Sequence, residues 1–228
     1  MNSFTTILFS LLGGVLPALL WLWFWLKEDK LHPEPKSRII MVFLGGMASV
    51  LVVIPLEKFI FAATVSIISI TTVILWASAE EISKYMVAYF TALKNRVTDE
   101  PIDAIIYMIT AALGFSAFEN TLFIFNLVDV GLFSQSIITG NSRFLGATLL
   151  HVASSAAIGV MIGLSYYKKP AVKKIFLVMG LCTAIILHTI FNLLIIKLEN
   201  DLFFVFAGVW VLIVLLIVLI EKIKKVNS

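Results

Sequence analysis

The chain of 228 residues is too apolar for a water-soluble domain, because 61% of its residues are hydrophobic and only 14% are charged. A soluble domain has about 25% charged residues and needs a polar surface around its core. The net charge is only +3, and this composition excludes a soluble enzyme, a disordered chain and a nucleic-acid-binding domain. The single cysteine, Cys182, lies in an apolar run, so neither a disulfide framework nor a cysteine-based metal site is expected.

Apolar stretches long enough to cross a bilayer as helices recur along the whole chain. Such a span needs about 20 mostly apolar residues, and seven stretches qualify, approximately 4–26, 39–56, 71–93, 103–127, 143–167, 174–196 and 202–220. The first lacks the basic start and the cleavage site of a signal peptide. We therefore predict an all-α, polytopic membrane helix bundle of about seven transmembrane helices, with residues 1–228 forming a single integral membrane domain.

The segment between the second and third predicted spans is ambiguous. Residues 59–70 are apolar and fit three alternatives: they lengthen the third span, lie flat on the outer membrane surface, or re-enter the bilayer. Pro55 is expected to end the second span abruptly, because a proline inside a helix removes one backbone hydrogen bond.

The lysines and arginines predict the orientation of the bundle. Only Lys58, Arg143 and Lys197 fall on one side of the predicted membrane, Lys84 lies inside a span, and the other thirteen fall on the opposite side. Cytoplasmic loops carry the excess of Lys and Arg. The N-terminus is therefore expected outside and the C-terminus in the cytoplasm.

Four predicted spans carry charged, imidazole or amide side chains in their interiors, where each charge costs about 2.5–3.5 kcal/mol on insertion scales. They are Glu80, Glu81 and Lys84 in the third span, Glu119 in the fourth, His151 in the fifth, and His188 and Asn192 in the sixth. Counted from the span ends at 1.5 Å per residue, Glu80, Glu119, His151 and His188 lie at one depth, roughly 12–14 Å below the outer boundary. One shared, water-accessible cavity is the economical explanation.

The spacing of these residues suits hydrolysis without a serine or cysteine nucleophile. Lys84 follows Glu80 by four residues and Glu81 by three, so it can pair with either carboxylate and position it as a general base for water. His188 and Asn192 lie four residues apart and share a helix face, from which both can donate to an oxyanion.

Taken in chain order, these motifs resemble the PrsW family of intramembrane proteases, which is related to the CAAX-processing and bacteriocin-immunity proteases. The motifs are Glu80-Glu81-x-x-Lys84, Phe118-Glu119-Asn120, a histidine in the next span and His188-x-x-x-Asn192, with further likeness at Pro33-Glu34-Pro35 and from Asp103 to Tyr107. The resemblance covers nearly the whole chain. It departs at Phe123, where the family often has tyrosine, and at Asn192, where it often has aspartate.

The resemblance implies an intramembrane endopeptidase of a bacterial cell membrane that cleaves a transmembrane or membrane-proximal protein, such as an anti-sigma factor in regulated signalling. We expect Glu80, in preference to Glu81, to take a proton from water. Glu119 and His151 would orient that water or protonate the leaving amine. His188 and Asn192 would stabilise the oxyanion, with Lys84 in a supporting role.

No cofactor is favoured for this scheme, but zinc is possible. Its candidate ligands are His151, His188 and Glu119, although the chain has no HExxH motif. Two other functions stay open: a proton-coupled transporter, since buried acids and histidines also build proton relays, and a non-catalytic membrane scaffold. The expected partners are the lipid bilayer and a membrane protein substrate, cut in the outer half of the bilayer or close to its surface.

Overall fold

Helices make up every regular element in the computed structural model, which describes residues 3–29, 32–64, 69–198 and 202–224. In chain order they are α1 (Ser3–Trp25), η1 (Leu26–Asp29), α2 (Lys36–Thr64), α3 (Ile70–Ala88), η2 (Tyr89–Leu93), α4 (Asp103–Asp129), α5 (Phe133–Ser142), η3 (Arg143–Ala147), α6 (Thr148–Leu164), α7 (Pro170–Lys197) and α8 (Leu202–Lys224). The predicted all-α class is confirmed.

Six helical stretches within the described residues are long and apolar enough to cross a membrane: Ser3–Asp29, Lys36–Thr64, Asp103–Asp129, Phe133–Leu164, Pro170–Lys197 and Leu202–Lys224. The third predicted span corresponds to α3 and η2. Helix α3 is not among the six, and it carries Glu80, Glu81 and Lys84 within little more than one turn. The total of seven spans therefore stays a prediction.

Two sequence-based boundaries were wrong. Pro55 does not end the second span, because α2 continues through it to Thr64. A proline removes only one helical hydrogen bond, a loss that helices in membranes tolerate. Residues 59–64 thus extend α2 rather than the third span, while residues 65–68 lie outside the described residues. The predicted start of the fifth span at Arg143 was also late, because one continuous helical stretch runs from Phe133 through η3 to Leu164.

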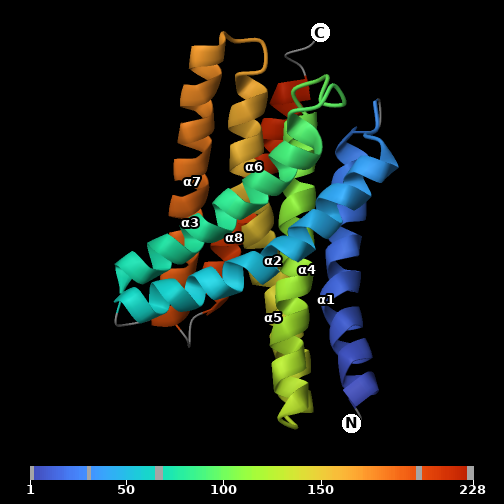
Figure 1. The fold of residues 1–228 in the computed structure, drawn as a ribbon, viewed down its shortest axis with the longest axis vertical. Coiled ribbons are helices and arrows are strands. Elements are labelled where there is room, and N and C mark those ends of the chain that lie inside the picture. The colour runs from blue at the N-terminus through green and yellow to red at the C-terminus, as the bar shows by residue number, and fades with distance from the viewer. Residues whose placement is uncertain (1–2, 30–31, 65–68, 199–201, 225–228) are drawn as a thin grey trace.

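Helix α4 forms the centre of the bundle and packs against α1, α2 and α6. Figure 1 shows α2 and α3 as a tilted, antiparallel pair that crosses the steeper helices obliquely. Helix α6 lies between α4 and α7 and also contacts α8. The polar segments of α3, α4, α6 and α7 are thereby directed into the interior of the bundle.

Glycines permit the closest helix contacts around α4. A Cβ added at Gly114 would collide with the backbone carbonyl of Phe43 in α2, and one at Gly159 in α6 would collide with the backbone of Ile105 in α4. Small residues allow such approach in membrane bundles, where packing replaces the hydrophobic effect as the force between helices. These contacts hold α4 firmly between α2 and α6.

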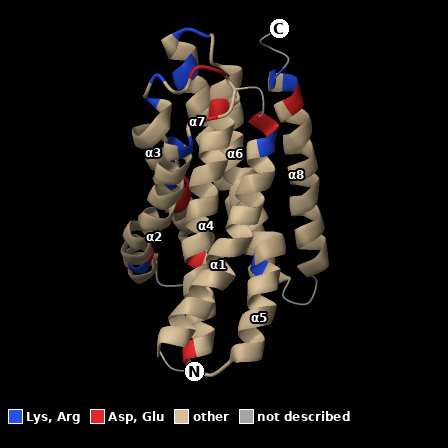
Figure 2. Ribbon diagram, turned by 90° about the vertical axis from the view of Figure 1, so that its right-hand side faces the viewer, with Lys and Arg blue, Asp and Glu red and all other residues tan. Residues whose placement is uncertain are grey.

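Basic residues are concentrated at one end of the bundle. Figure 2 shows most Lys and Arg at the end where α8 finishes, and few at the opposite end. At the basic end, Lys224 pairs with Glu28 at 2.7 Å and so links α8 to η1. The distribution supports the predicted cytoplasmic location of this end.

Candidate active site

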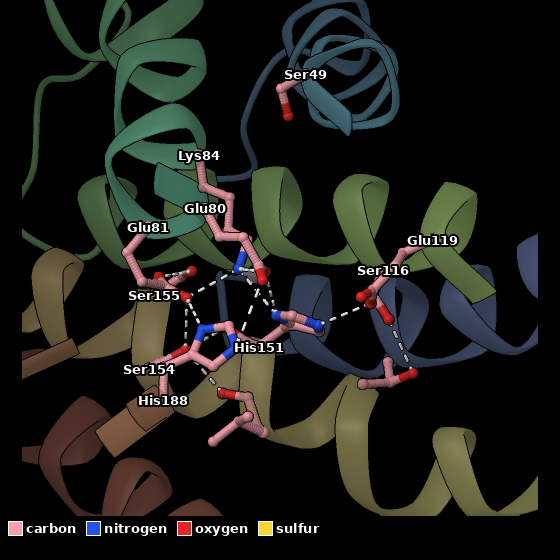
Figure 3. Close-up of polar contacts among 12 residues, drawn as sticks. Ser49, Glu80, Glu81, Lys84, Ser116, Glu119, His151, Ser154, Ser155 and His188 are labelled. Atoms are coloured by element: carbon pink, nitrogen blue, oxygen red, sulfur yellow. Dashed lines mark hydrogen bonds and ion pairs between the residues drawn. The ribbon is translucent and has the colours of Figure 1, made fainter. Parts of the chain in front are cut away.

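The charged and imidazole side chains singled out in the sequence come together from four helices. Figure 3 shows Glu80, Glu81 and Lys84 of α3 beside Glu119 of α4, His151 of α6 and His188 of α7. Glu81 and Lys84 are completely buried, and the other four are largely so. Their convergence inside an apolar bundle requires that each charge be paired or hydrogen-bonded.

Glu81 is the most heavily bonded member of the cluster. Its Oε1 accepts hydrogen bonds from Lys84 Nζ at 2.8 Å and Ser154 Oγ at 3.0 Å, and lies 2.9 Å from His188 Nδ1. Its Oε2 accepts from Ser155 Oγ at 2.7 Å. Both oxygens of Glu81 are thus engaged by buried protein groups, an arrangement that suits a positioning residue.

Glu80 has far fewer partners than its neighbour. Its Oε2 lies 3.4 Å from Lys84 Nζ, and 3.8 Å from both His151 Nδ1 and His188 Nε2. Successive helical residues point about 100° apart, so the two adjacent glutamates leave α3 in different directions. Glu80 is the one that reaches the space between the histidines.

Each histidine contacts a carboxylate with the nitrogen that points away from Glu80. His188 Nδ1 lies 2.9 Å from Glu81 Oε1, and His151 Nε2 lies 3.1 Å from Glu119 Oε2. Because an ionised carboxylate only accepts hydrogen bonds, these two ring nitrogens carry the protons. The opposite nitrogens then carry the lone pairs: Nε2 of His188 lies 3.8 Å from Glu80, and Nδ1 of His151 accepts from Lys84.

Lys84 is the cation of the cluster. Its ammonium lies 2.8 Å from His151 Nδ1, and 4.4 Å from the centre of the Phe115 ring. An ammonium can only donate, which agrees with the lone pair assigned to His151 Nδ1. Lys84 thus offsets the charges of Glu80 and Glu81, as its position after both glutamates suggested.

Arg143 belongs to the site although the sequence suggested only an outer loop charge. Its guanidinium pairs with Glu119, its Nε donates to Asn120 Oδ1 at 2.5 Å, and it stacks on the Phe123 ring 3.9 Å from its centre. The available signal was its separation of eight residues from His151, just over two helical turns. Phe123, which replaces the family's frequent tyrosine, thus has an aromatic contact that needs no hydroxyl.

Ser154 was also missed. It is buried and donates to Glu81, as does its neighbour Ser155. Both follow His151 by about one turn and so share its face of α6. That spacing was the signal available in the sequence.

A cavity of about 490 Å³ opens beside the cluster. The polar part of its lining consists mainly of Glu80, Glu119, Arg143, His151, His188 and Asn192. The apolar walls come from α5, α7 and α8 and include Ile138, Ile195 and Phe206. The amide of Asn192 has no hydrogen-bond partner among the described residues, so it is free to donate into this space.

Glu80, His151 and His188 also form a group that could hold a metal ion, with one ligand atom from each lying within 4.8 Å of the others. Histidines that bind metals usually donate their far N–H to a carboxylate, as His151 and His188 do here. Glu119, a candidate ligand in the sequence, instead contacts the far nitrogen of His151. The residues present fit zinc, which in catalytic sites takes three protein ligands and leaves one position open.

Fold and site together define a multi-pass membrane protein with a hydrolytic type of site buried in its helix bundle. A family model described as the PrsW family intramembrane metalloprotease matches residues 34–220. The chain belongs to this family, and the resemblance in its motifs is confirmed. It is therefore a membrane-embedded peptidase of a bacterial cell membrane, which removes the support for the transporter and scaffold alternatives.

Several curated relatives carry the name Protease PrsW. The relative from Halalkalibacterium halodurans is 28% identical over 228 residues, which cover 97% of this chain and 99% of the relative. The relative from Geobacillus kaustophilus is 31% identical over 173 residues, covering 73% and 70%, and that from Clostridioides difficile is 26% identical over 187 residues, covering 78% and 76%. No solved structure matches the chain.

Proposed function

We propose that the chain hydrolyses a peptide bond in a transmembrane or membrane-proximal protein, such as an anti-sigma factor, at the cavity beside Glu80. One observation carries this proposal: Glu80 lies at the edge of that cavity, 3.8 Å from a ring nitrogen of both His151 and His188, while both oxygens of Glu81 are engaged behind it. These three groups are suited to hold and activate a water. The apolar walls suit a hydrophobic substrate segment.

In the metal-free form of the reaction, Glu80 takes a proton from water while the water oxygen attacks the peptide carbonyl carbon. The carbonyl oxygen becomes an oxyanion, which the amide of Asn192 stabilises. The C–N bond then breaks, and the leaving nitrogen takes the proton from Glu80. Glu119 holds His151 in place, and His188 donates to the oxyanion only as an imidazolium, since its neutral form presents a lone pair here.

The group of Glu80, His151 and His188 also suits a zinc-dependent form of the same hydrolysis. Glu80, His151 and His188 would hold the ion, with Glu119 and Glu81 orienting the histidines. Bound zinc would polarise the carbonyl and make a water more acidic. Lys84 lies within reach of two of these three groups, so its ammonium would have to shift when the ion binds.

Cleavage itself is tested by mapping new protein termini in membranes from cells that express the chain or lack it. We expect termini that depend on the chain and lie within, or close to the outer end of, transmembrane segments, because the polar layer lies nearer the predicted outer face. An unchanged set of termini would contradict the proposed function. Termini on the cytoplasmic side would contradict the predicted depth of the site.

Zinc dependence gives a separate prediction. Purified protein that cleaves a substrate found by this mapping should contain about one zinc per chain, lose cleavage on chelation and regain it when zinc is restored. His188→Ala should lower the zinc content, because it removes one of three protein ligands, whereas Ser78→Ala, a change at a half-buried position on α3 outside the site, should not. Full cleavage by metal-free protein would instead establish Glu80 as the direct base.

A further inference from the structure

A second cluster of carboxylates lies at the end of the bundle where α1 finishes and α4 begins (Figure 1). It consists of Asp29 at the end of η1, Glu34 before α2 and Asp103, the first residue of α4. One oxygen from each lies within 4.8 Å of the others. The three residues are only 4%, 9% and 0% exposed, respectively, so they are not a solvated acidic surface.

Two oxygens of this cluster are buried without any hydrogen-bond partner among the described residues. They are Oδ2 of Asp29 and Oδ1 of Asp103. The other oxygen of Asp103 accepts the backbone amides of Asp99 at 2.8 Å and Glu100 at 2.9 Å. Leaving one buried polar group unsatisfied costs about 1–3 kcal/mol, and more for a charged one. Two such atoms in one cluster indicate a missing ligand.

No basic side chain within the described residues forms an ion pair with Asp29, Glu34 or Asp103. The nearby basic groups have other partners: His32 pairs with Glu100 at 3.5 Å, and Arg38 donates to the carbonyl of Thr91 at 3.0 Å. The closest polar side-chain partner of Glu34 is the hydroxyl of Tyr107, which donates to its Oε2. Among the described residues, no cation therefore balances these three buried carboxylates.

We propose that Asp29, Glu34 and Asp103 bind a hard divalent cation of the Mg²⁺ or Ca²⁺ class. The donor set consists of carboxylate oxygens, which such cations prefer and softer metals do not. The cation would tie the connection between α1 and α2 to the first turn of α4. Since α4 carries Glu119, this site would brace the active-site bundle from its opposite end.

Protons are the competing occupant of the cluster. Burial raises the pKa of Glu34 to about 8; the hydrogen bond from Tyr107 opposes this shift, and the nearby Asp103 and Asp29 carboxylates add to it. A cluster that held only protons would give no response to added Mg²⁺ or Ca²⁺ at constant pH. A cation site would respond to one of these ions at millimolar concentration or below.

The test is thermal unfolding of the full chain in detergent micelles, first stripped with a chelator and then titrated with Mg²⁺ or Ca²⁺. We expect the wild-type Tm to rise by roughly 5–10 °C when the ion reaches about a hundred times its Kd. Asp103→Asn should still fold, because the asparagine oxygen can accept both backbone amides. It should lose most of the rise in Tm that the cation causes. Asp99→Asn is the matched control, since only the backbone of Asp99 contacts the cluster, and it should keep the rise.

Two further measurements keep the outcome decisive. Glu80→Gln should retain the full rise, because the active site does not take part, so failure of this proposal and failure of the proposed protease function are distinguishable. If Asp103→Asn does not fold, calorimetric titration of Ca²⁺ into the wild type and Asp29→Asn replaces it, with about one site expected in the first and none in the second. An unresponsive wild type, or an Asp103→Asn variant that responds equally, would overturn the proposal.

Discussion

Replacement of Glu80 by glutamine is expected to lower the rate of substrate cleavage by roughly a hundredfold to ten-thousandfold, the range spanned by removal of a general base. Glutamine has nearly the same shape, but it can neither take a proton from water nor match a carboxylate as a zinc ligand. The loss is therefore expected in both forms of the reaction. The measurement is the initial rate at which purified protein cuts a substrate identified by terminus mapping.

The fold should survive this change. The hydrogen bond that Glu80 accepts from Lys84 is long, at 3.4 Å, and the carboxylate borders the cavity. Ser78→Ala on the same helix should leave both rate and stability unchanged, because among the described residues its hydroxyl bonds only the backbone of Ile74, one turn earlier in the helix. A Glu80→Gln protein that cleaves at the wild-type rate would show that Glu80 is neither base nor ligand.

Replacement of Glu81 by glutamine is expected to act chiefly on stability, lowering it by roughly 3–5 kcal/mol, the usual cost of removing one partner from a buried ion pair. The change removes the charge that faces Lys84. It also replaces one accepting oxygen by an NH₂ group that cannot accept from Lys84 or from a serine. Unfolding by heat or denaturant in micelles, followed by helical signal, provides the measurement.

A second substitution separates the charge from the packing. Adding Lys84→Met to Glu81→Gln removes the cation that has lost its closer carboxylate, so the double variant should regain part of the lost stability, a coupling that a double-mutant cycle measures. It should still cleave poorly, because His188 loses its carboxylate partner. A Glu81→Gln protein as stable as the wild type would contradict the inference that the buried hydrogen bonds and ion pair of Glu81 stabilise the fold.

Most of the fold could be predicted from apolar length alone, because a helix in lipid must satisfy its own backbone. The errors lie where a proline or polar residues suggested that a helix was interrupted, although the helix continues. Pro55 suggested an end, yet the surrounding bundle sustains α2 past it. The polar residues before Arg143 suggested a loop, yet they form α5.

The residues of the site were predictable from charges in apolar spans, but their arrangement was not. Glu80 and Glu81 are equivalent in the sequence, and only the rotation of α3 against α6 and α7 decides which carboxylate is enclosed by Ser154, Ser155 and His188. Arg143 escaped notice for a related reason. Its pairing with Glu119 depends on how α4 and the stretch from α5 to α6 lie beside each other.

The π-helical turn η3, from Arg143 to Ala147, has a consequence for how this site can vary between related proteins. Such a turn contains one residue more than an α-helical turn, so it accommodates the extra residue with little change in the angular phase between α5 and α6. Loss of one residue there would leave an ordinary α-helical turn, with Arg143 still directed toward Glu119. Single-residue deletions should therefore be tolerated within η3 and at the far end of α5, whereas a deletion in the regular helix between η3 and His151 would rotate Arg143 by about 100° and be strongly disfavoured.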